Sequence, residues 1–118
     1  MSHYTTAKQS VQLLDEEILL AAVRDAAKEI AGTRVQVSKD YISVSLPRGY
    51  MNYSRHSTGW QCNYDTDYTA AAIAMHHSVE RQYKAHTAVK QLRHQGYVGI
   101  KIVSKPSEEQ IRVTARRV

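Results

Sequence analysis

Residues 65–96 read DTDYTAAAIAMHHSVERQYKAHTAVKQLRHQG, and this stretch decides the architecture of the chain. The acidic and hydroxyl residues at 65–67 favour the start of a helix, and Gly96 favours its end. The stretch therefore predicts one helix from about Thr69 to His94. A helix of that length reaches across a whole face of a small sheet.

A shorter helix is predicted upstream, between a capping residue, Asp15, and a stop at Gly32. Its apolar stripe consists of Leu19, Val23, Ala26 and Ile30. Alternation of apolar and polar residues predicts strands at 2–12, 34–38, 41–46, 59–64, 98–102 and 111–116. We therefore expect a single α+β domain over residues 1–118, with both helices on one face of an antiparallel sheet. The order β-α-β-β-β-α-β-β is compatible with an internal duplication of a β-α-β-β unit.

The composition is that of a small globular protein, with 118 residues, 42% of them apolar and 23% charged. Phenylalanine is absent, so eight tyrosines and one tryptophan supply the aromatic bulk, and we expect tyrosine rings at the core edge. The single cysteine, Cys62, excludes an intramolecular disulfide and is expected to pack inertly in a strand. Without an apolar signal core or a long apolar run, a cytoplasmic location is expected.

Residues 47–58 are predicted to form an exposed loop without acidic side chains. Its tyrosines and cations are the predicted partner-binding residues, namely Arg48, Tyr50, Tyr53, Arg55 and His56. We therefore expect a small, non-enzymatic accessory or adaptor protein that binds another macromolecule, most simply a protein, through this loop and the sheet edge. Unpaired sheet edges would also permit a homo-oligomer.

The alternative prediction is an RNA- or DNA-binding module. The chain has a formal net charge of +5, which favours an anionic partner. The cations expected to share or border the polar face of the final hairpin are Lys101, Arg112, Arg116 and Arg117. Rings and arginines of the 47–58 loop would add stacking and phosphate contacts. Solvated surface charge is the simpler explanation of the same residues.

A third hypothesis is a histidine-centred metal or catalytic site. His76 and Glu80 are four residues apart on the long helix and could bind one metal ion, but such a site needs three or four ligands. Ser54 and His56 have no carboxylate nearby in the sequence to complete a nucleophilic triad. The sequence therefore predicts no cofactor and no particular reaction.

One stripe of the long helix is predicted to face the sheet, and it consists of His76, Val79, Tyr83, His86 and Val89. The segment RQYKAHT at 81–87 and the later QGY at 95–97, with the opening MSHY, resemble the plastid and cyanobacterial hypothetical-reading-frame-35 family, domain of unknown function 1257. The resemblance implies a small α+β protein and no defined activity. It draws attention to His3, Tyr83 and His86, and it would place His3 and His86 in one site if the first strand lay under the long helix.

Overall fold

The computed structural model describes residues 4–103 and 111–117, apart from the side chain of Tyr68. The elements in chain order are β1 (Tyr4–Thr6), α1 (Glu16–Lys28), β2 (Arg34–Val37), β3 (Tyr41–Ser45), β4 (Tyr50–His56), β5 (Gly59–Asp65), the 3-10 turn η1 (Thr66–Tyr68), α2 (Thr69–His94), β6 (Tyr97–Val103) and β7 (Arg112–Arg117). The α+β class is confirmed, and the predicted elements follow in the predicted order. There is one strand more, β4, and the first strand is shorter than expected.

Both helices begin where their capping residues predict. The Asp15 carboxylate accepts a hydrogen bond from Ile18 N at 3.1 Å and caps α1. Asp65 accepts from Asp67 N at 2.9 Å and caps the turn that leads into α2. After α2, Gly96 adopts φ +84°, the left-handed conformation in which a side chain would be strained.

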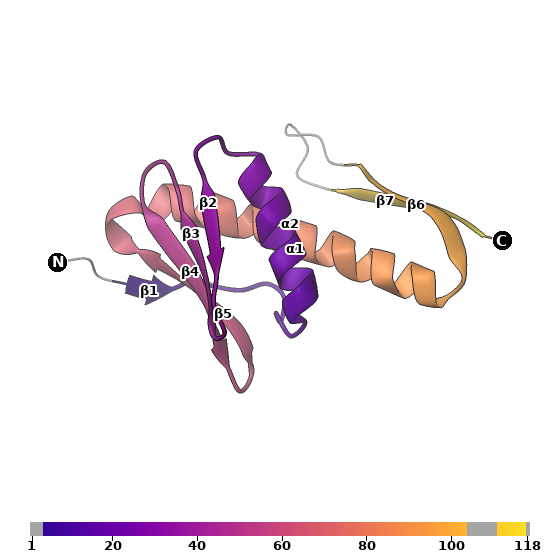
Figure 1. Cartoon of the computed structure of the whole chain (residues 1–118), viewed down its shortest axis with the longest axis horizontal. Coiled ribbons are helices and arrows are strands. Elements are labelled where there is room, and N and C mark those ends of the chain that lie inside the picture. Colours follow the sequence, from indigo (N-terminus) through magenta and orange to yellow (C-terminus); the bar gives the residue numbers. More distant parts are fainter. Residues whose placement is uncertain (1–3, 104–110, 118) are drawn as a thin grey trace.

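Five strands form one antiparallel sheet in the order β1-β5-β4-β3-β2. The predicted loop at 47–58 was wrong, because β4 is the central strand of this sheet and pairs with both β3 and β5. Its residues alternate as a strand requires: Met51 and Tyr53 enter the core, while Asn52 points to the other face. Figure 1 shows both helices on one side of this sheet.

The last two strands form a separate two-stranded sheet, with β6 antiparallel to β7. This hairpin packs chiefly against α2 (Figure 1). The predicted turn at 105–109 lies outside the described residues. Because the first half builds a five-stranded sheet and the second half an isolated hairpin, the described residues do not show two copies of one unit.

The core lies between the five-stranded sheet and the two helices. It joins the buried stripe of α1 to strand residues such as Ile42 and Val44, and to Met75 and Val79 of α2. Tyr53 is fully buried at its centre, deeper than the edge position expected for tyrosine rings. No helix among the described residues is long and apolar enough to cross a membrane.

Candidate functional site

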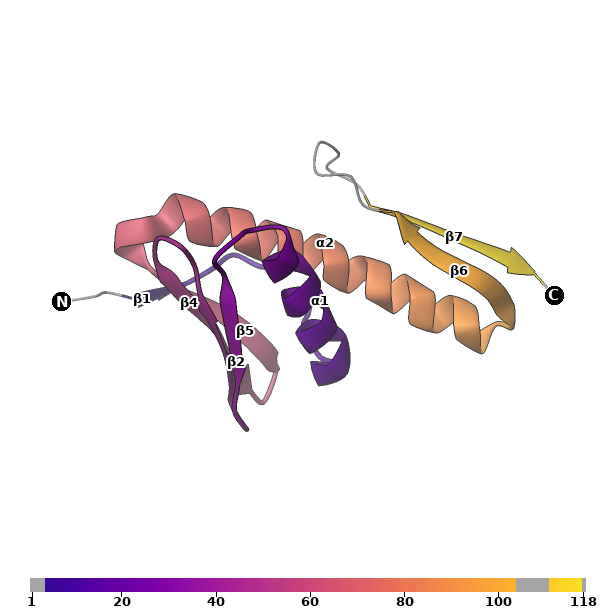
Figure 2. The same ribbon diagram turned by 45° about the horizontal axis from the view of Figure 1, so that its top comes forward.

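The second half of α2 continues beyond the sheet, and the β6–β7 hairpin lies beside it (Figure 2). We call residues 84–94, β6 and β7 together the arm, and residues 4–83 the body. The molecule is elongated in consequence, with principal extents of 56, 34 and 22 Å.

The positive charge of the chain is concentrated toward the arm. From Arg81 to the C-terminus the sequence has nine lysine and arginine residues and two acidic residues, whereas residues 1–80 have seven and nine. The body is therefore slightly acidic and the C-terminal part strongly basic. Such segregation produces a positive potential over one end of the molecule.

Three of the predicted nucleic-acid-binding residues share the outer face of the hairpin. Lys101 pairs with Thr114 across the strands, and Arg112 and Arg116 alternate with half-buried residues of β7. All three cations are exposed. No carboxylate within 4–103 or 111–117 forms an ion pair with them.

The fourth predicted cation of this group, Arg117, is placed differently. Its guanidinium lies 5.9 Å from the ring centroid of Tyr97, the first residue of β6. This is a cation–π arrangement that holds the two ends of the hairpin together. Arg117 therefore lies at the end of the hairpin, and its contact with Tyr97 stabilises the hairpin.

The residues predicted to bind a partner from 47–58 do not form one exposed surface. Tyr53 is a core residue, which corrects its assignment as a contact residue. Tyr50 is half-buried, and its hydroxyl donates to Ser43 Oγ at 3.0 Å. Arg48 and His56 are exposed. A role for them in binding stays a prediction.

Arg55 is exposed but engaged within the body. Its guanidinium lies 4.7 Å from the ring centroid of Trp60, donates to Glu16 Oε2 at 2.8 Å and is 3.6 Å from Asp40 Oδ1. These contacts join the N-terminal end of α1 to the sheet. Arg55 is therefore better explained as a structural residue than as a docking residue.

Ser54 and His56 meet on the uncovered face of the sheet. Their side chains are joined by a hydrogen bond of 2.9 Å between Ser54 Oγ and His56 Nε2. Asn63 Nδ2 donates to the same Ser54 oxygen at 2.9 Å. No carboxylate of the described residues forms an ion pair with His56, so the orienting acid of a triad is absent from that part of the chain.

The two described family-like residues connect α2 to the two ends of α1. The Tyr83 hydroxyl accepts from Leu14 N and Asp15 N, both at 3.1 Å. His86 Nε2 lies 2.7 Å from Asp25 Oδ2 of α1. His86 was expected on the buried stripe, but its side chain is 23% exposed. His3 lies outside the described residues, so a shared site with His86 stays a prediction.

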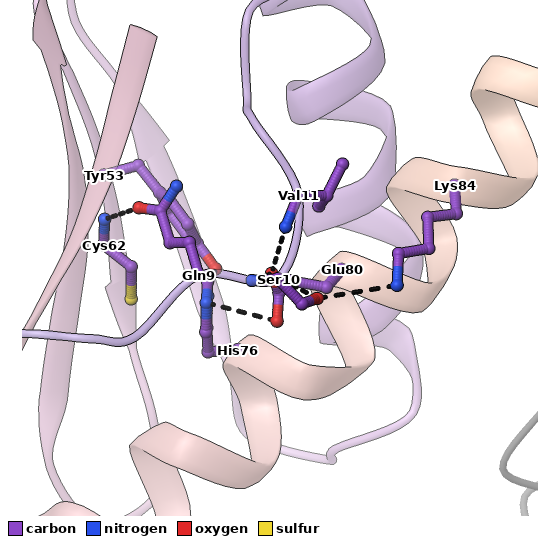
Figure 3. Close-up of polar contacts among 8 residues, drawn as sticks. All are labelled: Gln9, Ser10, Val11, Tyr53, Cys62, His76, Glu80 and Lys84. Carbon is purple, nitrogen blue, oxygen red and sulfur yellow. Dashed lines mark hydrogen bonds and ion pairs between the residues drawn. The ribbon is translucent and has the colours of Figure 1, made fainter. Parts of the chain in front are cut away.

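A buried polar network crosses the core from β4 to α2 (Figure 3). The Tyr53 hydroxyl and His76 Nδ1 share a hydrogen bond of 2.9 Å. His76 Nε2 lies 3.5 Å from Glu80 Oε1 and makes no hydrogen bond of standard geometry with the described residues. Burial lowers the pKa of His76, which keeps the imidazole neutral near pH 7.

Glu80 anchors the segment that precedes α1. Its Oε2 accepts from Ser10 N at 2.7 Å, Ser10 Oγ at 3.0 Å and Val11 N at 3.3 Å. Lys84 Nζ adds a long contact of 3.5 Å to the same serine hydroxyl (Figure 3). The buried carboxylate is therefore compensated by donors, as a buried charge requires.

A metal site at this network is incomplete. His76 and Glu80 are close enough to share an ion, but no cluster of three or more metal-binding side chains occurs among the described residues. Cys62 is buried, and burial raises its thiol pKa to about 12, so the reactive thiolate is disfavoured. The network is therefore best explained as part of the fold.

No protein-family model, curated protein or solved structure matches this chain. The family resemblance of residues 81–87 and 95–97 consequently stays a prediction. The arguments about function below depend on the geometry and charge of the described residues.

The sequence did not predict a contact residue of the buried network, or two residues of the sheet face that the helices leave uncovered. Ser10, which binds Glu80, was not singled out, because a serine in a coil segment gives no local signal. The asparagines Asn52 and Asn63 of the open sheet face were also missed, although their alternation with buried residues was a usable signal.

Proposed function

We propose that this chain is a non-enzymatic nucleic-acid-binding accessory protein that uses the arm to contact the phosphate backbone. The observation that supports this most is the outer face of the hairpin, where Lys101, Arg112 and Arg116 are exposed together. Phosphate contacts by such side chains supply most of the affinity in sequence-independent nucleic-acid binding.

The arrangement favours a polyanion over a folded acidic protein. A protein interface normally has a desolvated apolar centre with anchoring side chains. On the hairpin the exposed apolar residues, Val98 and Val103, are interspersed with cations. Because the arm also extends away from the slightly acidic body, a phosphate backbone can approach it with little repulsion.

The test is nucleic-acid binding measured by fluorescence anisotropy at several salt concentrations. The triple variant Lys101→Ala, Arg112→Ala, Arg116→Ala should bind much more weakly than the unaltered chain. The slope of log affinity against log salt should fall by about three, because each lost phosphate contact removes about one released counterion.

The matched control removes three exposed cations of the body through Arg24→Ala, Lys28→Ala and Lys39→Ala. This variant loses the same net charge and should keep most of the affinity and the salt slope. An equal loss in both triple variants would contradict an interface on the arm. Binding to polyglutamate as tight as to an oligonucleotide would favour an acidic protein partner and overturn the proposal.

A further inference from the structure

The body has a second surface of a different chemical kind, the face of the five-stranded sheet opposite the helices. We call it the open face. Two cross-strand rows of uncharged polar side chains cover its centre, Gln36–Ser43–Asn52–Asn63–Thr6 and Tyr41–Ser54–Gln61. No described helix packs on these rows, and most of their residues are exposed or half-buried.

The same face has three tyrosine rings: Tyr41 at the end of the shorter row, and Tyr4 and Tyr50 beside the rows. Tyr41 is 52% exposed and Tyr4 is 51% exposed. The ring of Tyr4 meets that of Tyr50 edge to face, with centroids 6.0 Å apart. Because a hydrogen bond to Ser43 holds the Tyr50 ring in place, Tyr4 and Tyr50 together form a fixed aromatic surface on one side of the polar rows.

Hydrogen bonds fix the amide groups at the centre of the open face. Asn63 accepts from Thr6 Oγ1 at 3.3 Å, and its Nδ2 donates to Asn52 Oδ1 at 3.0 Å and to Ser54 Oγ at 2.9 Å. Both amide planes are therefore oriented before a ligand arrives, which reduces the entropy lost on binding.

A hollow of about 340 Å³ lies on this face. It is bordered by two of the rings, Tyr4 and Tyr41, and by polar side chains that include Asn52, Gln61 and Asn63. The charged side chains of Asp40 and Arg55, which lie 3.6 Å apart, also border it. Its volume is within the range of small-ligand sites. Flat rings beside fixed amide donors and acceptors match the two properties of a nucleobase, a π face and a hydrogen-bonding edge.

We propose that the open face binds the bases of single-stranded nucleic acid, with Tyr4 and Tyr41 as stacking residues and Asn52 and Asn63 as groups that contact base edges. This inference rests on the proposed function, because phosphate contacts on the arm supply the non-specific attraction. A duplex hides its base faces, so the open face selects unpaired strands. The few large apolar groups on this face and its uncharged centre distinguish it from an apolar protein-docking surface.

The experiment compares a labelled single strand of roughly 24 nucleotides with a duplex of equal length. A strand of this length exceeds the roughly 16 nucleotides needed to follow the 56 Å long axis at about 3.4 Å each. The variant Tyr4→Ala, Tyr41→Ala should bind the single strand about a hundred-fold more weakly, about ten-fold for each ring. Duplex affinity and the salt slope should stay unchanged.

The matched control is Tyr4→Phe, Tyr41→Phe, which keeps both rings and should keep single-strand affinity. A second measurement follows the side-chain amide NMR signals of Asn52 and Asn63, which should shift with the single strand and stay in place with the duplex. This readout tests the open face even if the alanine variant is poorly folded.

The outcomes separate this inference from the proposed function. Wild-type single-strand affinity in the alanine variant, with unmoved amide signals, would overturn the open-face site while leaving the arm interface intact. Equal loss of duplex and single-strand binding in the alanine variant would also overturn it. If the unaltered chain binds neither nucleic acid at low salt, both proposals fail.

Discussion

The body and the arm differ in how deeply their side chains are buried. In the body, the core continues from Ala7 to Tyr83, and buried polar groups such as Glu80 have bonded partners. In the arm, every residue of β6 and β7 is half-buried or exposed. The buried residues of the body are therefore committed to stability, whereas Lys101, Arg112 and Arg116 of the arm are exposed, form no ion pair with the described residues and are available to a partner.

The largest expected effect tests this contrast in the core. Tyr53→Ala should destabilise the protein by about 3–5 kcal/mol, because it leaves a cavity and removes the hydroxyl that His76 contacts. Urea unfolding followed by circular dichroism measures the change. Tyr53→Phe keeps the ring and should cost only about 1–2 kcal/mol.

The counterpart in the arm is Ile102→Ala, at a half-buried position of β6. It should lower the free energy of unfolding by about 1 kcal/mol or less, since the hairpin can open without the body. Hydrogen exchange should quicken in β6 and β7 alone. Equal destabilisation by the Tyr53 and Ile102 variants would show that body and arm unfold as one unit.

The helices were predictable because their signals are local. Residues 65–67 and Gly96 mark the ends of α2, and Asp15 marks the start of α1, so spacing and capping alone located both. The strand β4 was missed because its cations and tyrosines suggested an exposed loop. Its alternation of Met51 and Tyr53 with polar residues was the competing signal, and burial in a central strand prevailed.

The candidate interface on the hairpin was also predictable, because alternation along one strand is enough to group Arg112 with Arg116. The buried network and the open face were not. Ser10 and Glu80 are 70 residues apart in the chain, and Thr6 and Asn63 are 57 apart. Contacts of that separation depend on strand order, which a single sequence does not determine.

An intermediate effect is expected when the hairpin is removed. A chain that ends at Gly96 keeps every residue of the main hydrophobic cluster, whose last member is Tyr83. It loses the contacts of β6 and β7 with α2, so the free energy of unfolding should fall by no more than about 2 kcal/mol. Thermal unfolding of the shortened chain measures this. Loss of cooperative unfolding would contradict an independent body.

A pH dependence of stability is also expected, and it originates in the body. Burial lowers the pKa of His76 in the folded state below the 6.5 of an ordinary histidine, despite the opposing charge of Glu80. As the pH falls, His76 is therefore protonated at a higher pH in the unfolded chain than in the folded chain. The contribution of the neutral His76 to the free energy of unfolding is complete above about pH 6.5. It declines, by at most about 1.4 kcal/mol per pH unit, as the pH falls from 6.5 toward the lower pKa of the folded state.

Urea midpoints between pH 7 and pH 5 should therefore fall more in the unaltered chain than in His76→Gln, which lacks the buried titrating group. The control is His94→Gln, which removes an exposed histidine of the arm instead. Equal flattening of the pH profile by both substitutions would mean that acid acts on general surface charge. A profile flattened by His76→Gln alone would place the acid sensitivity of the fold in the core of the body, where a neutral imidazole between Tyr53 and Glu80 must be kept from protonation.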